Sequence, residues 1–98
     1  MTIEIKRNTE ETTIKLVGRL DTITAPALEK TISEDIADVQ NLVLDLKSLE
    51  YISSAGLRVL LSAQKKFQKL GYMKVTNVGE EIMSVFEMTG FADILTIE

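Results

Sequence analysis

The most constraining feature of this sequence is a nearly continuous apolar stretch, residues 41–46, followed by a short loop and then the pattern of a long helix. A strand that is apolar on both faces is typical of parallel pairing with cover on both sides. The helix pattern runs from Ser54 to about residue 70, where Gly71 acts as a stop. Strand followed by helix predicts a right-handed crossover to a parallel neighbour.

Period-two alternation on either side predicts further strands. Residues 2–7 and 11–18 are expected to form a hairpin, with a polar turn between them. Residues 72–78 are expected to form a fourth strand, and residues 94–97 a short final one. These strands alternate with helix patterns, which is typical of an α/β sheet.

Two more helices are expected. Thr24 is a suitable cap for the first, with Pro26 in its opening turn, and the third covers residues 79–89 and ends at Gly90. Apolar residues at helical spacing define the faces expected to be buried. They are Leu28, Ile32 and Ile36 in the first helix, Leu57, Leu60, Leu61, Phe67 and Leu70 in the second, and Ile82, Val85, Phe86 and Met88 in the third, with Met73 and Met83 as further core residues.

The resulting order, β-β-α-β-α-β-α-β, predicts a single α/β domain over residues 1–98. Its mixed sheet is expected to have a parallel core and helices mainly on one face. In such sheets, functional residues gather in loops at the carboxyl ends of the strands. Here those loops are residues 18–24 and 47–54, so we expect Asp21 and Ser54 to lie near one another.

Composition excludes several classes of function. Fifteen acidic and eleven basic residues give a net charge of −4, and there are only two tyrosines and three phenylalanines. This balance argues against nucleic-acid binding. No stretch is long and apolar enough for membrane insertion, and the amino-terminal residues do not resemble a signal peptide. We therefore expect a cytoplasmic protein that binds other proteins.

Catalysis is also disfavoured. The chain contains no histidine and no cysteine, so the commonest general base and the thiolate nucleophile are missing. The serine pair, Ser53 and Ser54, lacks the flanking glycines of a hydrolase elbow, and no Walker loop or calcium loop is present. Nothing in the spacing supports a lysine dyad. The prediction is a non-enzyme without cofactor or metal.

Three side chains near the start of the long helix have two interpretations each. Ser54 is either the helix N-cap or a phosphoacceptor beside free backbone N–H groups, and the two roles are compatible. Asp21 is either a turn residue or a carboxylate aimed at the Ser54 hydroxyl or at a partner's cation. Arg58, one turn after Ser54, is either solvated or placed to hold a phosphate or a partner's acid.

Three segments carry a resemblance to a known family: residues 18–25, 42–46 and 51–57. Together they resemble the bacterial anti-sigma factor antagonists, members of the STAS domain family. The similarity extends over essentially the whole chain, to residues 88–91. It implies a small sheet with helices packed largely on one side.

The resemblance implies a partner-switching regulator. In this family, the unphosphorylated form binds an anti-sigma factor that is itself a serine kinase, phosphorylation breaks the complex, and a serine phosphatase resets it. The phosphoacceptor maps to Ser54, and Asp21 maps near the kinase contact. The partner-binding residues expected from the motifs are Asp21, Thr22, Ser53, Ser54, Ala55, Gly56 and Arg58.

One position departs from a common family pattern. Many members have Asp-Ser-[Ser/Thr]-Gly at the switch, whereas this chain has Ser53 in place of the acid. Ser53 is therefore the alternative modified residue. An alternative function is a STAS scaffold subunit of a transport or signalling complex in which Ser54 only caps the helix. The free chain is expected to be a monomer.

Overall fold

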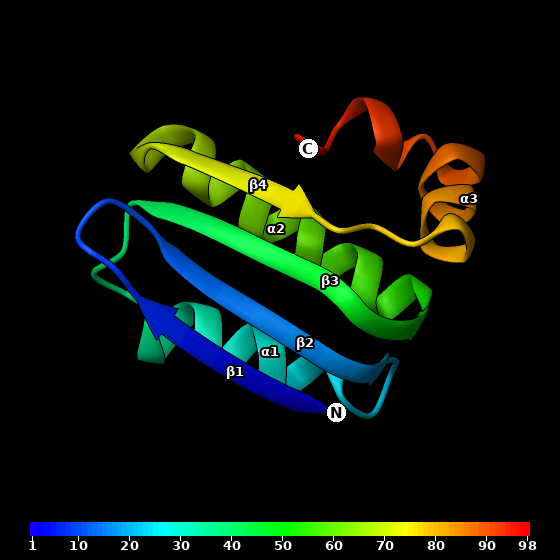
Figure 1. The fold of residues 1–98 in the computed structure, drawn as a ribbon, viewed down its shortest axis with the longest axis horizontal. Helices are drawn as coiled ribbons and strands as arrows, with labels where there is room; N and C mark the ends of the chain where they lie inside the picture. Colours follow the sequence, from blue (N-terminus) through cyan, green and yellow to red (C-terminus); the bar gives the residue numbers. More distant parts are fainter.

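A computed structural model describes residues 1–98, and its centre is a four-stranded sheet in the order β1-β2-β3-β4. Strands β1 (Thr2–Arg7) and β2 (Thr12–Leu20) form the antiparallel hairpin. Strand β3 (Asn41–Ile52) pairs in parallel with β2, and β4 (Tyr72–Thr76) pairs in parallel with β3. The predicted mixed sheet with a parallel core is confirmed (Figure 1).

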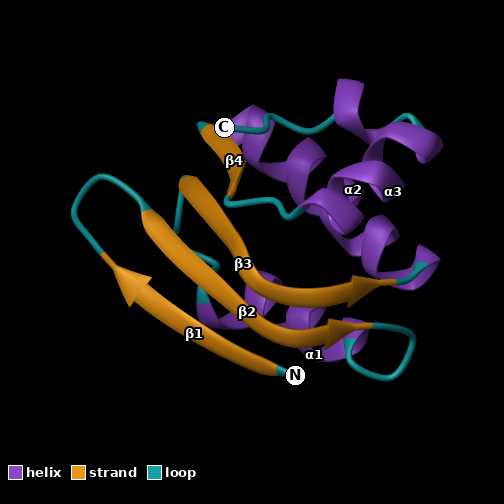
Figure 2. Cartoon of the chain, turned by 45° about the vertical axis from the view of Figure 1, so that its right-hand side comes forward, coloured by secondary structure: helices purple, strands orange, loops and turns teal.

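The helices lie mainly on one face of this sheet (Figure 2). Helix α1 (Ala25–Lys30) continues into one turn of π-helix (Thr31–Asp35), and α2 (Ser54–Leu70) is the longest element. Helix α3 (Glu80–Thr89) ends at a glycine with left-handed backbone and is followed by a short 3-10 turn (Phe91–Asp93). None of these helices combines the length and apolarity needed to cross a membrane.

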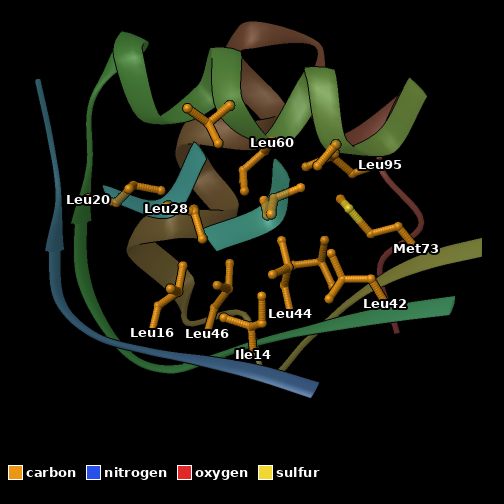
Figure 3. Close-up of a cluster of buried hydrophobic side chains, with 14 of the residues drawn as sticks. Ile14, Leu16, Leu20, Leu28, Leu42, Leu44, Leu46, Leu60, Met73 and Leu95 are labelled. Atoms are coloured by element: carbon orange, nitrogen blue, oxygen red, sulfur yellow. The ribbon is translucent and has the colours of Figure 1, made fainter. Parts of the chain in front are cut away.

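The core lies between the sheet and the helices (Figure 3). Alternate residues of the two central strands point into it, and the helices close it from the other side. Its fully buried members include Ile14, Leu16 and Leu20 from β2, Leu42, Leu44 and Leu46 from β3, and Leu28, Leu60, Phe67 and Phe86 from the helices. Burial of one such side chain contributes about 1.5–3 kcal/mol, so this layer dominates the stability of the fold.

Both central strands run further than predicted. Strand β2 continues through Leu20 instead of leaving the sheet at Gly18, and β3 continues through Ile52, so the loop expected over residues 47–54 does not exist. The parallel register shifts twice along this pair, which marks irregularities in the ladder. Because of these shifts, Leu49 and Ile52 both face the core although their spacing breaks the period of two.

The predicted cover on both faces of β3 is wrong. Val43 is buried, but it lies on the face opposite the helices, in register with Thr13 of β2 and Lys74 of β4. Two residues on, Asp45 is partly exposed on the same face. One buried valine on the open face therefore made the strand look apolar on both sides.

The predicted final strand is reduced to a single parallel bridge between Ile97 and Val75. Val75 donates its N–H to Thr96 and accepts one from Glu98, so the chain end adjoins β4 over only these residues.

Two predicted core residues are exposed. Leu70 is 45% exposed and Met88 is 87% exposed. Leu70 is the last residue of α2, and Met88 lies in the last turn of α3. Helical spacing assigned both to the buried face, but side chains in the last turn of a helix are less fully covered than those in its middle. Met83 and Val85 are partly buried and pack against the core, and Leu61 is partly buried.

Candidate functional site

The predicted site lies where the carboxyl ends of β2 and β3 meet. Leu20 and Ile52 are in register, and the N–H of Ser53 donates to the carbonyl of Leu20 at 2.9 Å. The turn after β2, residues 21–24, and the start of α2 therefore lie at the same end of the sheet (Figure 1). This confirms the predicted proximity of these two segments.

The helix cap is Ser53, so the interpretation of Ser54 as the N-cap is wrong. Ser53 has extended backbone, with φ −98° and ψ 175°, and its Oγ accepts the N–H of Gly56 at 3.4 Å. Its carbonyl accepts the N–H of Leu57 at 2.9 Å. Because β3 runs through Ile52, Ser53 is the only residue between strand and helix, and the cap falls there.

Ser54 is consequently the first residue of α2, and its side chain is exposed. The first N–H groups of a helix have no partner within the helix, and they lie at the positive end of its dipole. No acidic residue occupies the first turn of α2. A negative group attached to the Ser54 hydroxyl would meet a favourable field.

Asp21 holds its own turn together. Its Oδ1 accepts the N–H groups of Ile23 and Thr24, both at 3.0 Å. The hydrogen bond from the Thr24 N–H is the main cause that lowers the pKa of Asp21 below its ordinary value. Of the two roles considered for Asp21, the structure supports that of a turn residue, because its carboxylate accepts hydrogen bonds from the backbone of the turn.

Thr24 occupies the predicted N-cap position of α1, but its side chain does not cap the helix. Its hydroxyl makes no capping hydrogen bond to α1. Instead the hydroxyl accepts the N–H of Asp21 at 2.8 Å and donates to the carbonyl of Arg19 at 2.8 Å. The side chains of Asp21 and Thr24 thus both form hydrogen bonds with the backbone of the turn.

Two side chains beside this turn, Arg19 and Tyr51, were not predicted as site residues. The Arg19 guanidinium carbon lies 4.2 Å from the centre of the Tyr51 ring, and Arg19 Nε lies 3.9 Å from Asp21 Oδ2. Both residues belong to strand segments that were predicted as loops, and they are in register only because the ladder shifts between Gly18 and Arg19. No local pattern could have paired them.

A third missed residue is Ile23, whose side chain is 87% exposed in the middle of the turn. A signal for it was available: a large apolar residue placed between a strand and a helix has no periodic face to join. Thr22 beside it is also exposed.

The remaining predicted residues divide between surface and core. Arg58 is exposed and, with Thr22 and Ala55, lines a groove of about 340 Å³ between α1 and α2. Gly56 is buried, and a Cβ on it would lie 2.7 Å from Leu20 Cγ. Gly56 therefore packs the helix against the strands and presents no side chain to a partner.

A larger hollow of about 650 Å³ lies at the opposite end of the sheet, where the β1–β2 turn meets the residues before β3. Its lining is mostly polar and includes Glu10, Glu11, Asn41 and Tyr72. Tyr72 donates its hydroxyl to Glu11 there, and Asn41 donates to the carbonyl of Glu10. These contacts tie the hairpin to the sheet and are remote from Ser54.

The chain is similar in sequence and in structure to known proteins. The STAS domain model matches residues 2–98. The anti-sigma-B factor antagonist of Listeria monocytogenes is 30% identical over 103 residues, covering 100% of this chain and 89% of that protein. The crystal structure of an anti-sigma factor antagonist from Mycobacterium paratuberculosis has a TM-score of 0.88 and 28% identity, and the match covers 98% of this chain and 83% of that one.

A more distant structure shares the fold. The Bacillus cell fate determinant SpoIIAA in its phosphorylated form has a TM-score of 0.76 at 18% identity, over 99% of this chain and 91% of that one.

Proposed function

The chain belongs to the STAS domain family, and we propose that it is an anti-sigma factor antagonist switched by phosphorylation of Ser54. The unphosphorylated chain binds an anti-sigma factor that is a serine kinase. The kinase transfers the γ-phosphoryl group of ATP to Ser54 Oγ, which releases ADP and the hydroxyl proton, and the complex dissociates. A serine phosphatase then restores the hydroxyl by hydrolysis. The observation that carries this proposal is the exposed Ser54 hydroxyl at the first position of α2.

The division of roles between the two serines supports Ser54 over Ser53. Ser53 is partly buried, and its hydroxyl accepts the N–H of Gly56. A phosphate on Ser53 would disturb the helix cap. The Ser54 hydroxyl is not the cap, so it is accessible without any change in the fold.

Release follows from charge. A phosphate adds roughly −1.5 to −2 charges at neutral pH. The amino end of α2 stabilises that charge, and Arg58, one turn away, can reach it. When the complex forms, an acidic or apolar surface of the partner would face this charge, which weakens binding by several kcal/mol. Each 1.4 kcal/mol lowers the affinity about tenfold.

The test uses the full chain with its cognate anti-sigma kinase and Mg-ATP. We expect the added phosphate to map to Ser54, the Ser53→Ala variant to be phosphorylated, and the Ser54→Ala variant to bind the kinase but stay bound when ATP is added. Phosphate at another residue, or release of Ser54→Ala by ATP, would overturn the assignment. A chain that binds no such kinase would instead support the scaffold role.

A further inference from the structure

One edge of the sheet has no partner strand. Strand β1 is the outermost strand, and apart from β2 no segment forms a backbone hydrogen bond with it (Figure 1). At the other edge, Val75 of β4 forms backbone hydrogen bonds with Thr96 and Glu98 of the chain end. The free N–H and C=O groups of an outermost strand are a template on which another strand can pair.

Strand β1 lacks two of the features that protect such an edge. It contains no proline, and its register with β2 runs from Thr2 to Arg7 without a bulge. Ile5, near its middle, faces the helices, because it lies in register with the fully buried Ile14. Ile5 itself is 41% exposed, since β1 has no strand on its outer side. A strand added at this edge would cover Ile5.

The charges of β1 determine which strand fits. Glu4 and Lys6 flank Ile5 on the face without helices, and neither forms an ion pair in the structure. Charged residues on an edge strand disfavour the addition of other strands. An antiparallel second copy of β1 is the exception. When Ile5 lies opposite Ile5 of the second copy, Glu4 of each copy lies opposite Lys6 of the other.

The same charges exclude the neighbouring registers. A slip by two residues in either direction puts Glu4 opposite Glu4 or Lys6 opposite Lys6, and like charges directly opposite one another are destabilising. Within its own sheet, Glu4 also lies opposite Lys15 of β2, so a lysine would stand on each side of it. Arg7 forms an ion pair with Asp38 of its own chain at 3.3 Å.

We propose that two copies of this chain pair through β1 in antiparallel orientation, about a twofold axis at Ile5, and join their sheets into one. A twofold interface requires a self-complementary surface, and the order Glu4, Ile5, Lys6 is self-complementary. The dimer replaces the monomer expected from the sequence. It is independent of the proposed function, because neither Ser54 nor the turn after β2 takes part in the pairing.

The experiment measures the mass of the full chain by sedimentation equilibrium. The concentration is raised from about 10 μM to about 1 mM, because two short strands bury little area and such interfaces are weak. The wild-type mass should rise from 10.9 kDa toward twice that value. Lys6→Glu puts an acid opposite Glu4 of the other copy and should weaken association at least about tenfold. Lys47→Glu, the same charge change at an exposed residue of β3, should stay within about twofold of wild type.

A charge exchange tests the register itself. Glu4→Lys alone should associate as weakly as Lys6→Glu alone, whereas an equimolar mixture of the two variants should form a heterodimer, because each charge then faces its opposite. The chain that carries both substitutions should associate like wild type. Urea unfolding of each variant in dilute solution checks that the fold is unchanged.

Three results would rule out this dimer. They are a wild-type chain that stays monomeric at the highest concentration, a Lys6→Glu variant that associates as strongly as wild type, and a mixture of the two single variants that associates no more than either alone. None of these results bears on phosphorylation of Ser54.

Discussion

Replacement of Gly56 by alanine tests how tightly the start of α2 is held against the strands. A Cβ at this position would lie 2.7 Å from Leu20 Cγ, 3.0 Å from Leu20 Cδ2 and 2.9 Å from Ile52 Cγ1. Leu20 is 0% exposed and Ile52 is 5% exposed. Neither side chain can swing away, because the atoms in contact lie near the backbone and the surroundings are packed. The added methyl group must therefore displace the first turn of the helix.

The size of the effect follows from two opposing terms. Overpacking a filled core costs about 1–3 kcal/mol. Alanine gains up to about 1 kcal/mol over glycine inside a helix, and less in the first turn. The net expectation for Gly56→Ala is a loss of about 1–2 kcal/mol in the free energy of unfolding. For a domain of this size, 1 kcal/mol corresponds to roughly 4–8 °C in Tm, so the Tm should fall by roughly 5–15 °C.

Thermal and urea unfolding followed by circular dichroism measure this loss. Gly79→Ala is the matched control, because nothing lies within 4 Å of a Cβ at that position and its backbone φ of −71° suits alanine. The control should lose less stability than Gly56→Ala. In a Leu20→Ala background, the second substitution should cost less than in wild type, since most of the clashing atoms are gone. A Gly56→Ala chain as stable as wild type would refute the argument.

Two further predictions follow from named hydrogen bonds. Ser53→Ala should lower the free energy of unfolding by about 0.5–1 kcal/mol, the low end for a helix cap, because the hydrogen bond to Gly56 is 3.4 Å long. In the same urea titration, Ser54→Ala should change the free energy of unfolding by less than about 0.5 kcal/mol. A larger loss for Ser54→Ala than for Ser53→Ala would mean that the cap is misassigned. The hydrogen bond to Glu11 raises the pKa of Tyr72 above its ordinary value, so the stability it contributes is present below the unfolded pKa of about 10 and is lost as the pH rises through the folded pKa. In a Tyr51→Phe background, Glu11→Gln should move the absorbance titration of Tyr72 to lower pH, and an unmoved curve would contradict this.

The order of elements through α3 could be predicted because it depends on local periodicity, whereas the predicted final strand is only a single bridge. The bounds of α2 were also predictable, since a capping serine precedes it and Gly71 follows it. The end of β3 was not. Its continuation through Ile52 depends on register shifts against β2, and these arise from pairing between segments far apart in the sequence. Whether a face of the sheet is covered by helices also depends on segments far apart in the sequence, as the buried Val43 on the face without helices shows.

For the site, too, local features could be predicted from the sequence and features that depend on strand pairing could not. The proximity of Asp21 to the start of α2 could be predicted, because the carboxyl ends of neighbouring parallel strands meet at one edge. The capping role went to the wrong serine because the position of a cap depends on where the preceding strand stops. The contact between Arg19 and Tyr51 needed the same register.

The local structure around Ser54 favours a switch that acts through surface charge. Beneath it, Gly56 is packed so closely on Leu20 that the helix start has no room to move inward. Beside it, the Asp21 carboxylate fixes the neighbouring turn through backbone N–H groups. A conformational switch needs a second arrangement of similar energy, whereas a packed core resists small shifts. We therefore expect a phosphate on the exposed first residue of α2 to change the surface that a partner contacts and to leave the fold beneath it unchanged.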